Sequence, residues 1–221
     1  MTDRATQSGH APSATAASST VAASTTAEST TAASRPAFRL DNEQLAFRFT
    51  ATLSDRHGTP VERLPDPARL DDWLAANDIA VGSEHATPAD LDLARRLREA
   101  IHRIGTAIAR NEPTAEPDRG VLNRLLRDEQ LCPELTSTGL RWQPVTGHHV
   151  RGALSRVAHE AVTLLGGPQR DRVKSCQNPD CRGLYVDTSQ GRNRRWCSMN
   201  ICGNRAKKAR FRGPRTTDGN A

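Results

Sequence analysis

Several features that would mark an enzyme or a membrane protein are missing from this sequence of 221 residues. Aromatic residues make up only 4% of the chain and hydrophobic residues 36%, which predicts a modest apolar core beside some disordered sequence. No apolar run approaches the roughly 20 residues that a membrane helix needs, so we expect no membrane span. The N-terminal stretch also has no continuous apolar segment of the kind found in export signals.

Recognisable catalytic motifs are missing as well. The sequence contains no nucleophile elbow, no phosphate-cradling glycine loop and no zinc-protease helix. An enzyme would need an open pocket with convergent titratable groups, and no such constellation can be recognised. We therefore predict that this protein is not an enzyme.

Cysteine is scarce but is placed informatively. Four of the five cysteines form two C-x4-C pairs, Cys176 with Cys181 and Cys197 with Cys202, separated by fifteen residues. Each pair can bend a loop around one metal ion, and together they supply four thiolates to a tetrahedral centre. Disulfides would need an oxidising compartment, and inert core thiols rarely come in matched pairs. We predict a structural zinc ion, because an all-cysteine shell leaves no position open for water or substrate.

The local pattern around these cysteines predicts a small module. Residues 184–186 are strand-like and residues 190–194 are turn-like, which suggests a hairpin leading back to Trp196. Ser198 can cap a helix over residues 199–211 that carries the last ligand near its start. This order of elements is that of a treble-clef-like module, although the wide ligand spacing leaves a zinc ribbon open.

Positive charge is concentrated in this module. Residues 170–215 hold thirteen Lys and Arg against three acidic residues, a net charge of +10, while the whole chain carries +6. A cationic face can simply keep a small domain soluble, but charge on a metal-braced loop and helix is typical of surfaces that contact phosphates. The candidate nucleic-acid-binding residues are Arg192, Arg194, Arg195, Asn204, Arg205, Lys207, Lys208 and Arg212.

The chain resembles a known family through three short stretches. They are RRWCSM at residues 194–199, CGNRAK at 202–207 and YVDTS at 185–189. Their order and spacing are similar to those of the CGNR zinc finger, which is named for the four residues at 202–205. Members are described as stress-induced transcriptional regulators with an all-helical N-terminal domain of the ABATE type. The resemblance implies a regulator with a metal-braced DNA-binding module.

The N-terminal part of the chain predicts a helical domain, so the expected fold class is mainly α. Asp41 or Asn42 can cap a first helix that runs through Leu53, although Phe47 and Phe49 also alternate like a strand. Further helices are predicted over residues 68–77, 87–110, 117–127 and 150–165, with a small hairpin near 140–145. Trp73 is expected in the core. We expect Cys132, the unmatched cysteine, to be a buried or half-buried structural thiol.

These patterns divide the chain into four parts. The predicted parts are a disordered Ser/Thr/Ala-rich tail at 1–35, a helical ABATE-like domain at 36–168, the zinc finger at 169–213 and a disordered tail at 214–221. The leading hypothesis is a cytoplasmic, bacterial-type regulator that binds duplex DNA, with the helical domain sensing a small-molecule effector or forming a homodimer. The alternative is a protein- or RNA-interaction module that does not bind DNA sequence-specifically.

Overall fold

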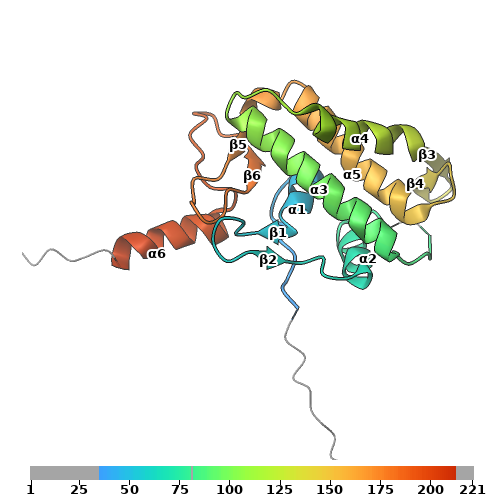
Figure 1. Cartoon of the computed structure of the whole chain (residues 1–221), viewed down its shortest axis with the longest axis horizontal. Coiled ribbons are helices and arrows are strands. Elements are labelled where there is room, and N and C mark those ends of the chain that lie inside the picture. Colours follow the sequence, from blue (N-terminus) through green and yellow to red (C-terminus); the bar gives the residue numbers. More distant parts are fainter. Residues whose placement is uncertain (1–34, 81, 213–221) are drawn as a thin grey trace, which may run out of the picture. The chain divides into compact units, whose positions relative to one another are not determined.

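The structure, a computed structural model, describes residues 35–80 and 82–212 (Figure 1). Its helices are α1 (Leu45–Thr50), α2 (Pro67–Ala76), α3 (Pro88–Ala109), α4 (Glu116–Asp128), α5 (His149–Gly166) and α6 (Asn204–Arg212). Its strands pair as β1 (Leu53–Ser54) with β2 (Val61–Glu62), β3 (Leu131–Thr136) with β4 (Gly139–Pro144), and β5 (Val173–Ser175) with β6 (Leu184–Val186). The predicted mainly α class is confirmed. The predicted tails lie outside the described residues, except for Arg35.

Helix α3 is the element against which the other helices pack. It begins with a capping box, in which the Thr87 hydroxyl accepts from the backbone N–H of Asp90 and the Asp90 carboxylate accepts from that of Thr87. Apolar residues from Leu91 to Ile108 then recur at helical spacing and are buried, so that α3 touches α1, α2, α4 and α5. The helix predicted over 87–110 is confirmed.

The first helix is shorter than predicted and is capped differently. Helix α1 begins after Gln44, and neither Asp41 nor Asn42 caps it with a side chain. Instead the carboxylate of Glu160, on α5, accepts hydrogen bonds from the backbone N–H groups of Leu45, at 2.9 Å, and Ala46. The helix ends at Thr50 because Leu53 pairs with the next strand. A partner from more than a hundred residues away therefore replaces the predicted local cap.

Helix α2 places its aromatic residue in the centre of the helical region. Asp66 caps the helix by accepting from the backbone N–H of Arg69 at 2.9 Å. Trp73 has no exposed surface, and its ring centroid lies 4.9 Å from that of Phe49. The prediction that Trp73 belongs to the core is confirmed.

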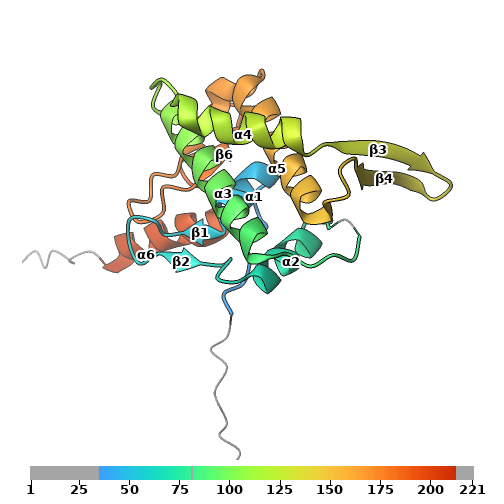
Figure 2. The same cartoon turned by 45° about the vertical axis from the view of Figure 1, so that its right-hand side comes forward.

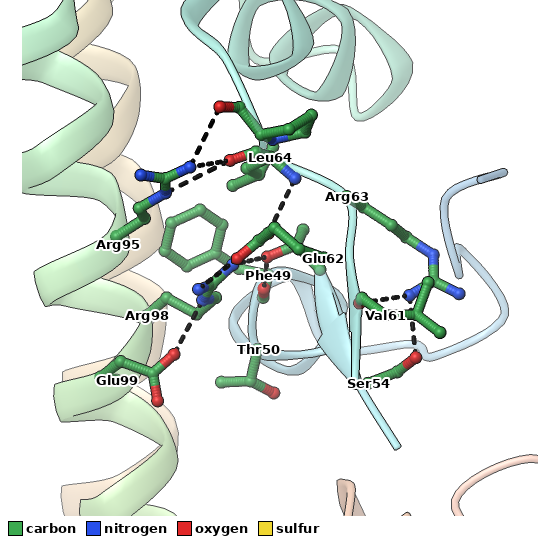
Figure 3. Close-up of polar contacts among 12 residues, drawn as sticks. Phe49, Thr50, Ser54, Val61, Glu62, Arg63, Leu64, Arg95, Arg98 and Glu99 are labelled. Atoms are coloured by element: carbon green, nitrogen blue, oxygen red, sulfur yellow. Dashed lines mark hydrogen bonds and ion pairs between the residues drawn. The ribbon is translucent and has the colours of Figure 1, made fainter. Parts of the chain in front are cut away.

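An ion pair between the buried Arg98 and the half-buried Glu62 ties the β1–β2 ribbon to α3. Figure 3 shows Arg95, Arg98 and Glu99 of α3 reaching toward the segment that holds Glu62. Arg98 is 3% exposed and forms two hydrogen bonds to the Glu62 carboxylate, at 2.7 and 2.8 Å. Arg95 donates to the backbone oxygen of Leu64 at 2.8 Å. These contacts fix the ribbon, whose turn faces the cysteine segment.

The hairpin β3–β4 extends away from the helices (Figure 2). Its strands are antiparallel in a register from Leu131 opposite Pro144 to Thr136 opposite Gly139, which confirms and lengthens the predicted hairpin. The expectation that Cys132 is buried or half-buried is wrong, since its side chain is exposed on this hairpin. A two-stranded hairpin that projects from a core cannot cover both of its faces.

The cysteine segment follows α5 and shares part of the main core. Val173 of β5 and Leu184 and Val186 of β6 belong to the same buried apolar cluster as the helices. Gly105 of α3 permits this contact, because a Cβ atom there would lie 2.5 Å from Cδ1 of Leu184. The predicted strand at 184–186 is confirmed. Its predicted partner is wrong, since β6 pairs with β5 rather than with the segment near Trp196.

Candidate metal centre and basic surface

Four cysteine sulfur atoms converge at one point. The Sγ atoms of Cys176, Cys181, Cys197 and Cys202 all lie within 4.8 Å of one another. Two of the separations are 3.6 Å, from Cys181 to Cys197, and 3.7 Å, from Cys197 to Cys202. A tetrahedron with Zn–S bonds of about 2.3 Å has edges of about 3.8 Å, whereas a disulfide needs about 2.0 Å. The arrangement fits four ligands of one metal ion, and none of the five cysteines is in a disulfide.

The first cysteine pair is held by the turn between β5 and β6. The backbone N–H of Cys176 donates to the Gly183 oxygen at 2.8 Å, and that of Cys181 donates to the Asn178 oxygen at 3.1 Å. Gly183 lies close to two sulfurs, because a Cβ atom there would stand 3.3 Å from Sγ of Cys181 and 3.5 Å from Sγ of Cys197. The loop therefore wraps tightly around the sulfur cluster.

The second pair is held at the start of the C-terminal helix. Ser198 caps a π-helical turn, η2 (Met199–Gly203), by accepting from the backbone N–H of Ile201 at 3.3 Å. Cys202 lies within this turn, directly before α6, so the predicted cap and the predicted place of the last ligand are confirmed. The order of a knuckle in a hairpin, a second loop and a helix with the last cysteine at its start is that of a treble clef.

The four thiols influence one another's ionisation. Hydrogen bonds from the neighbouring thiols, first that of Cys181 and then that of Cys197, lower the pKa of Cys176, whereas the thiol of Cys176 raises the pKa of Cys197 and of Cys202. Cys176 and Cys202 have no exposed surface. A thiolate that is buried in this way needs a compensating positive charge, which a divalent cation supplies.

A buried carboxylate organises the long loop between the cysteine pairs. Asp187 has no exposed surface and accepts hydrogen bonds from Lys174 at 2.6 Å, from the Ser189 hydroxyl at 2.5 Å and from the backbone N–H of Arg194 at 3.2 Å. Burial raises the pKa of Asp187, but the hydrogen bonds from Lys174 and Ser189 outweigh that effect and hold the pKa at about 2. The carboxylate therefore stays ionised and fixes the loop at neutral pH.

Two family models match this chain. The first, ABATE, described as "Putative stress-induced transcription regulator", matches residues 43–168, which is more than half of the sequence. The chain belongs to the ABATE family. The second, the CGNR zinc finger, matches residues 172–215. No curated protein matches the chain. Neither matching family is an enzyme family.

The arginine of the CGNR signature joins the zinc finger to the ABATE region. Arg205 donates to both carboxylate oxygens of Asp55, at 2.7 and 3.2 Å, and Arg39 donates to the same carboxylate at 2.9 Å. Asp55 sits in the turn of the β1–β2 ribbon with a side chain only 10% exposed. The hydrogen bond to Asp55 raises the pKa of Arg205. We call this group of three residues the Asp55 clasp.

Other predicted nucleic-acid residues also have structural contacts. Arg194 donates to the backbone oxygens of Trp196, at 2.9 Å, and Cys197, at 2.7 Å, and its guanidinium lies 4.7 Å from the centre of the Tyr185 ring. Asn204 donates to the backbone oxygen of Asn200 at 2.9 Å. These two side chains brace the loop and the helix start that carry the cysteines.

The remaining candidates face solvent. Arg192 and Arg195 are exposed on the long loop, and Lys207, Lys208 and Arg212 are exposed on α6. Helix α6 has no buried residue, so its side chains are accessible all round the helix. Among the described residues none of these five cations forms an ion pair. The structure therefore separates cations that hold the finger together from cations that remain available.

Sequence reasoning missed the residues that hold the finger in place. Asp55 and Arg39 lie more than a hundred residues before the cysteines and carry no motif, so only the fold brings them to Arg205. Asp187 stands in the YVDTS stretch that carried the resemblance, but its bonding to Lys174 required the β5–β6 pairing. Of the described helices, none combines the length and the apolar character that crossing a membrane requires.

Proposed function

We propose that this protein is a zinc-dependent regulator that binds duplex DNA through its CGNR finger. The observation that carries this proposal is the convergence of four sulfurs in a segment where five exposed cations form no ion pair among the described residues: Arg192, Arg195, Lys207, Lys208 and Arg212. Cys176, Cys181, Cys197 and Cys202 would hold the zinc ion, which supplies a structural crosslink rather than a reactive centre. Its fit is supported by the S–S separations of 3.6 and 3.7 Å.

Within this proposal the basic residues divide into two groups. Arg192, Arg195, Lys207, Lys208 and Arg212 contact the phosphates of the DNA backbone, since their charges are exposed. The second group holds the loop and the start of α6 in place through hydrogen bonds and consists of Arg194, Asn204 and Arg205. The Arg205 side chain is nevertheless 47% exposed. For Asn204 and Arg205 to contact base edges, they would first have to give up their present hydrogen bonds to Asn200 and Asp55.

The remaining features of the proposal follow from the family and from the size of the finger. A regulator acts where the chromosome lies, which in a bacterial-type cell is the cytoplasm. A finger of this size binds weakly alone, so the protein acts as a homodimer that doubles the contact with DNA. The ABATE region would then mediate dimerisation or sense a small-molecule effector, and it has no catalytic role.

The test combines metal content with the salt dependence of DNA binding. Wild-type protein should hold one zinc ion per chain. Its affinity for duplex DNA should fall with salt, with a log–log slope of about 0.9 per phosphate contact. A variant with Lys207, Lys208 and Arg212 replaced by Ala should lower that slope by about three units. The matched control replaces Arg96, Arg124 and Arg127, which are exposed in the ABATE region, and removes the same charge.

Two results would overturn the proposal. Native protein without stoichiometric metal would remove the scaffold on which the basic surface depends. Equal slopes for the finger variant and the ABATE-region control would show that only net charge, and no particular surface, attracts DNA. Unchanged zinc content in both variants confirms that the finger remains folded during the comparison.

A second candidate function is supported by one side chain. Phe211, near the end of α6, is 89% exposed, which is unusual for a large aromatic residue. Such a ring can stack on an unpaired RNA base or insert into a protein partner. Competition among duplex DNA, structured RNA and single strands decides between the candidates. Preferential binding to RNA that is lost in Phe211→Ala, with duplex binding unaffected, would favour this alternative.

A further inference from the structure

A basic cleft lies between the end of α3 and the zinc finger. It encloses about 400 Å³ and is lined by Arg110 from the ABATE region and by Lys174, Arg182, Arg192 and Arg194 from the finger. No acidic side chain lines it. We call it the junction cleft, and two of its arginines, Arg110 and Arg182, are not among the residues that the sequence singled out.

The five cations of the cleft are not equivalent. Lys174 is paired with Asp187 at 2.6 Å, and Arg194 donates hydrogen bonds to two backbone oxygens. Arg110, Arg182 and Arg192 are exposed, and their guanidinium groups make no hydrogen bond or ion pair within the described part of the chain. Three fork-shaped donors therefore converge on one cavity without an anion from the protein.

The backbone at two of these arginines points to a use for the side chains. Arg182 has a φ of 49° and Arg192 a φ of 48°, both in the left-handed region. Glycine adopts this conformation without steric cost, whereas a residue with a Cβ atom is strained there. Both positions nevertheless carry arginine, and both arginines line the same cleft. Both arginines therefore occupy positions that glycine would adopt at less steric cost.

The cleft must attract anions through its side chains alone. Helix α3 presents its C-terminal end to the cleft, and the partial charge at a helix C-terminus is negative. Arg110, the C-cap of α3, offsets that charge at the point where it would repel a ligand. A planar guanidinium matches the oxygens of a phosphate group better than a point charge does.

We propose that the junction cleft clamps a backbone phosphate of the bound DNA, with Arg110, Arg182 and Arg192 as the donors. This inference rests on the proposed DNA-binding function and extends it, because it makes the ABATE region part of the DNA interface. One strand then contacts α3 and the zinc finger together. Binding to DNA therefore stabilises the present arrangement of the two regions.

The first experiment uses glycine substitutions that relieve the backbone while removing the donor. Full-length protein carrying Arg182→Gly and Arg192→Gly should keep its zinc content and its melting temperature. Its salt slope for duplex DNA should fall by about one unit, because the two arginines contact the same phosphate. Asn111→Gly is the matched control, since Asn111 also has a left-handed φ, of 55°, but does not line the cleft. The control should bind DNA as wild type does.

The second experiment tests the contribution of the ABATE region. Arg110→Ala should also lower the slope, by no more than about one unit because the three arginines share one phosphate, while Arg96→Ala, an exposed arginine on the same helix, should leave it unchanged. Equal effects of the two variants would overturn the proposal. An intact slope in the Arg182/Arg192 variant, together with a reduced slope in the α6 variant, would also overturn it and leave the proposed function standing. Wild-type protein that binds no DNA would defeat the proposed function itself.

A third arm separates a DNA phosphate from a small phosphate ligand. Pyrophosphate, added at constant ionic strength, should displace DNA only weakly from the wild-type protein. It should displace no DNA from the Arg182/Arg192 variant. Tight stoichiometric binding of pyrophosphate by wild type, lost in that variant while DNA binding persists, would show that the cleft serves a free phosphate compound and would overturn the proposal.

Discussion

The ABATE region and the zinc finger are stabilised by different means. The helices bury a continuous apolar cluster that includes Trp73, Phe49 and Leu97. The buried cluster of the finger consists of Cys176, Cys181 and Cys202, with Trp196 and Ile201 packed against it. Hydrophobic burial stabilises the first region, whereas the second, apart from Val173, Leu184 and Val186 in the main core, has a sulfur cluster that fits a metal ion. From this comparison we expect denaturant to act mainly on the helical region and a metal chelator to act mainly on the finger.

Removal of the metal ligands should produce the largest difference between the two regions, because it should unfold the finger and leave the helices folded. Structural zinc contributes about 10–16 kcal/mol to the folding of small finger domains. Cys176→Ser should therefore abolish zinc binding and amide-exchange protection around η2 and α6, while the helical signal of α3 and α5 persists. Cys132→Ser is the control, since its exposed thiol lies outside the cluster and should leave the zinc content unchanged. Simultaneous loss of protection in α3 would show that the two regions unfold as one.

Loss of the ion pair between Arg98 and Glu62 should destabilise the ABATE region rather than the zinc finger. Arg98→Met removes two hydrogen bonds to the Glu62 carboxylate, which is 32% exposed and keeps the backbone N–H of Leu64, so the expected cost is about 2 kcal/mol. Urea unfolding followed by circular dichroism measures this loss. Arg96→Met removes an exposed arginine of the same helix and should change the free energy of unfolding by less than about 0.5 kcal/mol. Equal midpoints for the two variants would refute the role of this ion pair.

The Asp55 clasp joins the two regions and should show a smaller effect. Arg205 is half exposed, so its hydrogen bonds to Asp55 are partly screened by solvent. A double-mutant cycle with Asp55→Ala and Arg205→Ala should give a coupling energy of about 1 kcal/mol. The exposed pair of Glu116 and Arg119 within α4 provides the control cycle, with about 0.3 kcal/mol expected. A coupling no larger than that of the control would mean that the clasp does not fasten the finger.

The smallest expected effect is a pH dependence of the ABATE region. Burial raises the pKa of Glu62, but the hydrogen bond from Arg98 and its charge outweigh this, so the pKa lies below the ordinary value of 4.5. An acid with a lowered pKa in the folded state stabilises the fold fully above that ordinary value and loses the contribution as the pH falls below it. The free energy of unfolding should therefore fall with decreasing pH more steeply for wild type than for Arg98→Met.

The difference between these two proteins reports the two carboxylates that Arg98 contacts, Glu62 and Glu99. Acid also protonates the cysteine ligands, but that loss of metal is common to wild type and variant. The comparison is made by urea midpoints between pH 6 and pH 3. Parallel curves for the two proteins would show that the lowered pKa of Glu62 does not contribute to stability.

Local patterns predicted much of both regions. The capping box at Thr87 and the helical spacing that follows fix α3 through interactions among neighbours, so the sequence alone located that helix. The first helix was misplaced at its start because its cap is the Glu160 carboxylate, on another helix. The strand at 184–186 was found, but its pairing with β5 was not, since pairing is decided by the packing of both strands on α3.

The same division holds for the candidate site. Four cysteines at matched spacing and a run of basic residues identify a zinc finger, because metal ligation and charge are properties of residue type and short separation. Which cations remain available was decided only by the tertiary structure. Folding brings Asp55 into contact with Arg205 and places Arg110 and Arg182 in the lining of one cleft, although these residues are too far apart in the chain for any local pattern to specify.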